Sequence, residues 1–112
     1  MSDGDVSYTA PHYDLTHVQE LIRTGKVAYN VTKDARALGI AKQGMKECLC
    51  ALEAEHFHKT SRDWHVPEEW QDVYRCRFCD IALYIKFTMR TLEGRTVLVT
   101  SFKRDEKGAG DV

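Results

Sequence analysis

Hydrophobic and polar residues alternate along residues 69–103 in three consecutive runs that are rich in Val, Ile, Tyr, Phe, Trp and Thr. The clearest alternation is in the middle run, whose apolar members are Ile81, Leu83, Ile85, Phe87 and Met89. A period of two is typical of a β-strand that buries one face. We therefore expect strands at about 70–79, 81–90 and 96–103, with residues 92–95 as the last hairpin turn.

The polar side of the middle run carries chemistry that suits a nucleic-acid backbone. Its residues follow at two-residue spacing and are Ala82, Tyr84, Lys86, Thr88 and Arg90. Arg75 and Arg77 share one side of the preceding run. A sheet that buries one face leaves the other as a rigid surface. Amines and guanidinium groups on such a surface can bind phosphate through charge-assisted hydrogen bonds.

The first half of the chain predicts short helices. Thr16 and Gln19 have the spacing of a capping box for a helix over 16–25. Two further helices are expected at 32–39, capped by Thr32, and at 42–52. Val27, Tyr29 and Val31 alternate, which predicts a short edge strand over 26–31.

The remaining segments read as connections and ends. We expect a turn or a single helical turn over 53–59, which would place Lys59 on a loop, and a loop over 60–68. Residues 1–10 and 105–112 are expected to be flexible. Helices followed by antiparallel strands predict one α+β domain over residues 1–112.

Charge is distributed unevenly along the chain. The net charge is −1, but residues 70–104 contain seven Lys and Arg against three Asp and Glu, a net charge of +4. This suits an anionic partner on one face, although charged residues also keep exposed strands soluble. The sequence shows neither an apolar run of about 18 residues nor a basic leader, so we expect a cytoplasmic protein without a membrane partner.

Four cysteines raise the question of zinc. Cys48 and Cys50 are two residues apart, and Cys76 and Cys79 form a Cys-x-x-Cys pair. Two cysteines at i and i+2 of a helix point about 200° apart, and the second pair lies at the end of a strand. We therefore favour buried or unused thiols over a zinc site, and expect neither a metal nor a cofactor.

Several motifs carry a family resemblance that covers residues 10–104. They are W-Q-D-V-Y-R at 70–75, L-Y-I-K at 83–86 and V-L-V-T-S-F-K at 97–103, with weaker matches at 15–25, 44–45 and 57–59. In these motifs the chain resembles the MqsR, or motility quorum-sensing regulator, family of bacterial toxins. The resemblance implies a RelE-like fold, in which short helices pack on one face of a twisted antiparallel sheet.

The resemblance also implies an activity and a set of active-site residues. Members of the family are endoribonucleases, or mRNA interferases, of type II toxin–antitoxin systems. The matching catalytic positions in this chain are Lys59, Gln71, Tyr84 and Lys103. Tyr84 would orient or protonate the scissile phosphate, and Lys103 would stabilise its charge. From the residues themselves we expect further phosphate contacts from Arg62, Arg75, Arg77 and Lys86.

The implied partners are an mRNA substrate with GCU-like sites and a zinc-containing, DNA-binding, MqsA-like antitoxin; direct DNA binding by this chain alone is not expected. Cleavage would need neither a ribosome nor a metal. One departure from the family is His58, which precedes Lys59 where an aromatic residue is usual and adds an imidazole. Two other hypotheses remain open: an RNA- or protein-binding domain without catalysis, and a small zinc protein.

Overall fold

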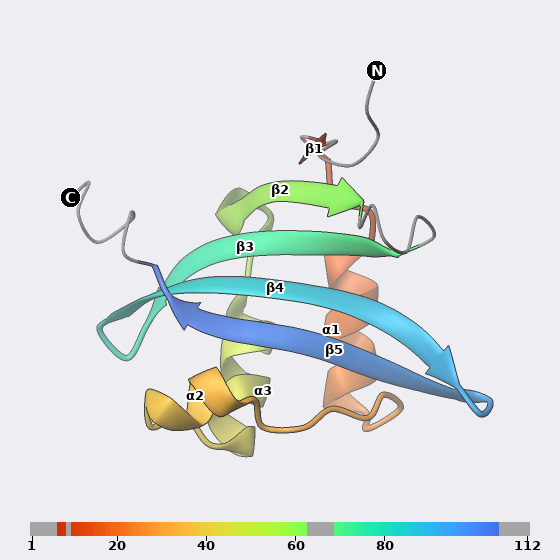
Figure 1. Ribbon diagram of the computed structural model, residues 1–112, viewed down its shortest axis with the longest axis horizontal. Helices are drawn as coiled ribbons and strands as arrows, with labels where there is room; N and C mark the ends of the chain where they lie inside the picture. Colours follow the sequence, from red (N-terminus) through yellow and green to blue (C-terminus); the bar gives the residue numbers. More distant parts are fainter. Residues whose placement is uncertain (1–6, 9, 63–68, 106–112) are drawn as a thin grey trace.

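The computed structural model describes residues 7–8, 10–62 and 69–105, and it shows an antiparallel sheet with helices behind one face (Figure 1). The elements in chain order are β1 Ser7–Tyr8, α1 Leu15–Arg23, α2 Lys33–Ala37, α3 Lys42–Ala51, the 3-10 helix η1 Ala54–His56, β2 Phe57–Arg62, β3 Trp70–Phe78, β4 Ile81–Leu92 and β5 Arg95–Arg104. The five strands lie in the order β1-β2-β3-β4-β5. The predicted α+β class is confirmed.

The core lies between the sheet and the helices. Its helical side includes Val18 and Ile22 of α1 and Met45 of α3, which are at most 2% exposed. Its sheet side is formed by the apolar side chains of β4 that the alternation predicted, together with Tyr74 of β3 and Phe102 of β5. The β4 side chains are Ile81, Leu83, Ile85, Phe87 and Met89. Because this face is fully used in packing, the opposite face of the sheet is the one available to partners.

Two tight hairpins join the last three strands. Cys79 and Asp80 connect β3 to β4, and Glu93 and Gly94 connect β4 to β5; all four residues have φ between 51° and 75°. Positive φ at both central positions belongs to the turn type that matches the twist of a hairpin. The three predicted strands and the last turn are confirmed, with β4 and β5 slightly longer than expected.

The N-terminal helices are confirmed, but the predicted cap of α1 is wrong. Asp14, rather than Thr16, caps the helix by accepting hydrogen bonds from the backbone N–H groups of Thr16 and His17. The side chain of Gln19 instead donates to the carbonyl oxygens of Leu49 and Leu52. The amide of Gln19 therefore ties α1 to the end of α3.

Two predictions about strands need correction. Segment 26–31 forms only one parallel bridge, between Ala28 and Val97, which covers part of the β5 edge. Conversely, Phe57–Arg62 is strand β2, although it was predicted as a turn and a loop. Its sequence has little apolar alternation, so the strand depends on pairing with β3 rather than on its own pattern. The rest of the predicted loop, 63–68, lies outside the described residues.

Both ends of the described chain are fixed to the sheet. Asp105, expected in the flexible C-terminal end, is 7% exposed, and its N–H donates to the carbonyl of Ala82 at 2.8 Å. Before α1, the buried carboxylate of Asp72 accepts hydrogen bonds from the N–H groups of His12 and Tyr13. Within the described residues, none of the helices is long and apolar enough to cross a membrane.

Candidate active site on the open face of the sheet

Strand register places three of the proposed functional residues in one row. Arg75 of β3 pairs with Tyr84 of β4, and Tyr84 pairs with Lys103 of β5. The next row on the same face contains Lys86 opposite Ser101. Directly opposite residues of an antiparallel pair have Cβ atoms about 5 Å apart. The sheet therefore brings the phenol and the cations together on one side.

A β-bulge adds Lys59 to this face. Phe57 pairs with Tyr74 and Lys59 pairs with Val73, so His58 is an extra residue in β2. Phe57 contacts Tyr74 on the core side, whereas His58 and Lys59 both line a hollow on the other side. We call this side of the sheet the platform; its polar residues include His58, Lys59, Gln71, Arg75, Arg77, Tyr84, Lys86 and Lys103.

The hollow on the platform has a volume of about 410 Å³. It is lined by His58, Lys59, Arg75, Tyr84, Lys103, Arg104 and Asp105. The ring centroids of His58 and Tyr84 are 6.1 Å apart in an edge-on arrangement. Three of the four predicted catalytic residues thus share one site, which contains an imidazole, a phenol and several cations.

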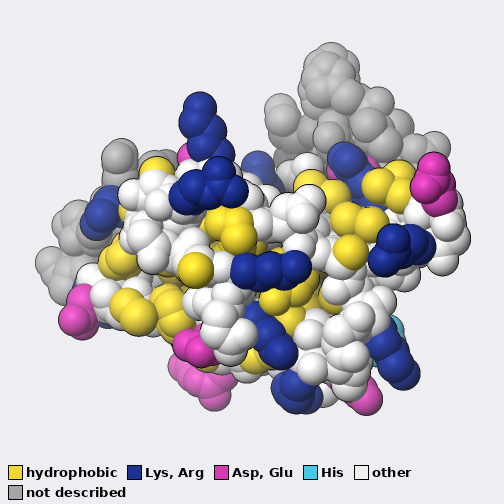
Figure 2. Space-filling view, turned by 90° about the horizontal axis from the view of Figure 1, so that it is seen from below, with side chains coloured by type: hydrophobic (Ala, Val, Ile, Leu, Met, Phe, Trp, Pro, Cys, Tyr) yellow, Lys and Arg dark blue, Asp and Glu magenta, His cyan; other side chains and the backbone are white. Residues whose placement is uncertain are grey.

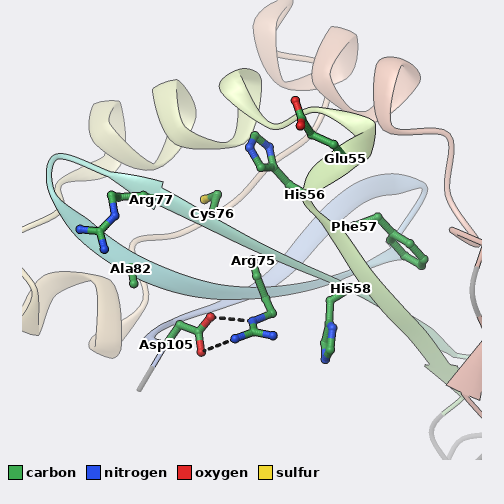
Figure 3. Close-up of a pocket in the computed structure, with 9 residues that line it drawn as sticks. All are labelled: Glu55, His56, Phe57, His58, Arg75, Cys76, Arg77, Ala82 and Asp105. Carbon is green, nitrogen blue, oxygen red and sulfur yellow. Dashed lines mark hydrogen bonds and ion pairs between the residues drawn. The ribbon is translucent and has the colours of Figure 1, made fainter. Parts of the chain in front are cut away.

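The two kinds of cation in the hollow differ in their partners. The guanidinium of Arg75 binds the carboxylate of Asp105, with the Nε–Oδ2 distance at 2.6 Å and the Nη2–Oδ1 distance at 3.4 Å (Figure 3). Within the described part of the chain, Lys59 and Lys103 form no ion pair. Arg75, predicted to contact phosphate, is therefore largely compensated by Asp105. The unbalanced positive charge comes from the two lysines and from Arg104, which also lines the hollow.

Gln71, the fourth predicted catalytic residue, lies on the same face but in a neighbouring hollow of about 100 Å³, which Lys86 also lines. Beside it, Arg90 donates two hydrogen bonds to the carboxylate of Glu69, at 2.7 and 2.8 Å. The pairing Val73–Lys86 separates this hollow from the Arg75–Tyr84 pair. Gln71 and Lys86 therefore lie beside the hollow that contains Tyr84 and not within it.

Two predicted phosphate contacts lie away from the hollow. Arg62 pairs with Trp70, and its guanidinium lies 5.9 Å from the Trp70 ring centre. Trp70 also stacks on His12, with the ring planes 7° apart. Arg77 is exposed at the far end of β3 and donates to the carbonyl of Asp80. Neither arginine joins Tyr84 and Lys103.

Positive charge is not confined to the platform. Figure 2, viewed from the side of α2 and β5, shows Lys and Arg side chains spread over the surface with hydrophobic side chains between them. The platform is distinguished by its arrangement rather than by its charge alone, because a phenol and an imidazole stand among amines in one hollow.

The cysteines are not gathered into one site. The sulfur atoms of Cys48 and Cys76 are 4.0 Å apart, Cys50 faces the carbonyl of Gln19, and Cys79 is exposed in its hairpin. The hydrogen bond between the Cys48 and Cys76 thiols, together with burial, raises the pKa of Cys48. The same hydrogen bond lowers the pKa of Cys76. Among the described residues no group of three or more His, Cys, Asp or Glu side chains could hold a metal ion.

Sequence reasoning missed some members of the site. Asp105 was assigned to a flexible end, and Arg104 was counted only as part of the basic segment, yet both line the hollow. Asp105 carried no local signal, because its partner Arg75 is thirty residues away in the sequence. His58 was predicted to add an imidazole beside Lys59, but the bulge that orients it has no signature in the sequence.

Comparison with known proteins agrees with these observations. The family model described as "Motility quorum-sensing regulator, toxin of MqsA" matches residues 10–104. A curated relative, the mRNA interferase toxin MqsR of Escherichia coli (strain K12), is 32% identical over 95 residues, which covers 83% of this chain and 93% of the relative. The chain therefore belongs to the motility quorum-sensing regulator (MqsR) toxin family.

Proposed function

We propose that this chain is the toxin of a type II toxin–antitoxin system and cleaves mRNA as an endoribonuclease. The observation that carries the proposal is the hollow in which Lys59, Tyr84 and Lys103 meet. The name of the Escherichia coli relative, mRNA interferase, supports the same activity. A RelE-like fold, a cytoplasmic location and a zinc-containing, DNA-binding antitoxin are part of the proposal.

The proposed reaction is in-line attack of a 2′-hydroxyl group on the adjacent phosphate. The O2′–P bond forms, the P–O5′ bond breaks, and the products are a 2′,3′-cyclic phosphate and a 5′-hydroxyl. The ammonium groups of Lys59 and Lys103 would stabilise the charge on the phosphorus oxygens, and Tyr84 would orient the phosphate. These roles need no metal ion, because the cations are supplied by the protein.

Substrate binding would extend beyond the hollow. Lys86 and Gln71 line the neighbouring depression on the same face, where an amine and an amide can contact a flanking phosphate or base. Family resemblance suggests GCU-like triplets as the cleavage sites. The binding surface would then follow β4 from Tyr84 towards Thr88.

The test is cleavage of a GCU-containing RNA oligonucleotide by purified protein in the presence of EDTA. We expect fragments that end in a cyclic phosphate, with Tyr84→Phe and Lys103→Ala each slowing cleavage about 100-fold or more. Lys33→Ala, which removes an exposed lysine on α2, is the matched control and should leave the rate unchanged. Intact RNA, or equal rates for both platform variants and the wild type, would refute the proposal. Binding without cleavage would instead favour a non-catalytic RNA-binding domain.

A further inference from the structure

We infer that His58 is a further catalytic residue, the general base that takes the proton from the attacking 2′-hydroxyl group. This inference rests on the proposed ribonuclease function and deepens it. Alkyl amines and phenols in general lose their protons only near pH 10, which makes these functional groups poor bases at neutral pH. An imidazole titrates near pH 6.5 and is the side chain best suited to this step.

The position of His58 follows from the bulge in β2. In a regular strand, neighbouring side chains point to opposite faces, so His58 and Lys59 could not both face the platform. The register changes between Phe57 and Lys59, which leaves His58 as the extra residue. Bulges of this kind often occur beside active sites, where they redirect a side chain. Here the bulge leaves two adjacent functional residues in one hollow.

The surroundings of His58 suit a proton acceptor beside a phosphate. Its ring lies edge-on to Tyr84, with 6.1 Å between the ring centres. Figure 3 shows His58 and the Arg75 guanidinium extending from the sheet away from α1 and α3, whereas His56 lies on the side of these two helices. His58 also lines a second pocket, of about 400 Å³ (Figure 3). The charged and titratable groups that line this pocket and the hollow on the platform are Glu55, His56, Lys59, Arg75, Cys76, Arg77, Tyr84, Lys103, Arg104 and Asp105.

The proposed step balances without another reactant. The imidazole nitrogen of His58 accepts the 2′-hydroxyl proton as the O2′–P bond forms. The 5′-oxygen leaves as the P–O5′ bond breaks, and it takes a proton from the platform, whose donors are the Lys59 and Lys103 ammonium groups and the Tyr84 phenol. Solvent then takes the proton from His58 and returns a proton to the platform donor, which restores both the base and the acid.

The experiment measures the rate of RNA cleavage from pH 5 to 9 for the wild type, His58→Gln and His58→Ala. We expect the wild-type rate to rise with pH through the range near 6.5 where an imidazole loses its proton. Both variants should be about 100-fold slower and lack this rise. Added imidazole should restore part of the activity of His58→Ala. His17→Gln, an exposed histidine on α1, is the control and should match the wild type.

Two results would overturn the assignment. One is a rate within about threefold of the wild type, with the same pH profile, for both His58 variants. The other is a slower variant that keeps the wild-type pH profile and is not rescued by imidazole, which would indicate a positioning role. A wild-type protein that fails to cleave RNA would contradict the proposed function itself, so the two failures are distinguishable.

Discussion

Replacing Asp72 by Ala is expected to lower the free energy of unfolding by about 3 kcal/mol. The carboxylate is fully buried and accepts hydrogen bonds from the N–H groups of His12 and Tyr13, at 3.0 and 2.9 Å. A hydrogen bond to a charged group contributes about 1.5–3 kcal/mol. We apply the lower value, about 1.5 kcal/mol, to each of the two hydrogen bonds, because water can reach the N–H groups of this part-buried segment once the carboxylate is gone. The two hydrogen bonds together give the loss of about 3 kcal/mol.

Urea unfolding followed by tryptophan fluorescence measures this loss, since Trp70 stacks on His12 in the segment that Asp72 holds. With a slope of about 1.5 kcal/mol per M urea, the unfolding midpoint should decrease by about 2 M. Asp34→Ala, an exposed aspartate in the first turn of α2, should cost less than about 1 kcal/mol and serves as the control. A loss for Asp72→Ala no larger than that of Asp34→Ala would refute the reasoning.

Three further predictions concern other residues. Glu93→Asn should raise the free energy of unfolding by about 0.5 kcal/mol, because Asn tolerates the φ of 51° better than Glu; no change in the urea midpoint would contradict this. Burial, with the nearby charge of Asp72, raises the pKa of Tyr74 to about 12, whereas the unfolded chain loses this proton near pH 10. Stability should therefore fall as the pH rises from about 10 to 12, and urea unfolding of Tyr74→Phe should show a shallower fall. Asp105→Asn removes the charge that compensates Arg75, so the salt dependence of RNA binding, measured by fluorescence anisotropy, should steepen by about 0.7 in log–log slope.

The central part of the fold could be predicted from the sequence because its signal is local. Alternation in β4 reports directly which residues are buried, and the turn at Glu93 and Gly94 fixes the register with β5. That register places Lys103 opposite Tyr84. The family resemblance had grouped these two residues, and the register that brings them together depends on only one strand pattern and one hairpin.

The rest of the site depends on contacts between distant parts of the chain. β2 contains mostly polar residues and forms because it pairs with β3, so Lys59 was placed on a loop instead of a strand. Asp105 reaches Arg75 only after the sheet has formed. Arg62 was grouped with the phosphate contacts by charge, but its pairing with Trp70 decides its position. Long-range pairing of this kind has no periodic signal in the sequence.

The order of the elements along the chain has a consequence for biosynthesis. The helices come first, and the strands that cover Val18 and Met45 come last. While the ribosome is still adding β5, the apolar sides of α1 and α3 lack the surface they pack on, and Tyr84 lacks its neighbour Lys103. A growing polypeptide therefore has neither a closed core nor the complete proposed site until its last strand has joined the sheet.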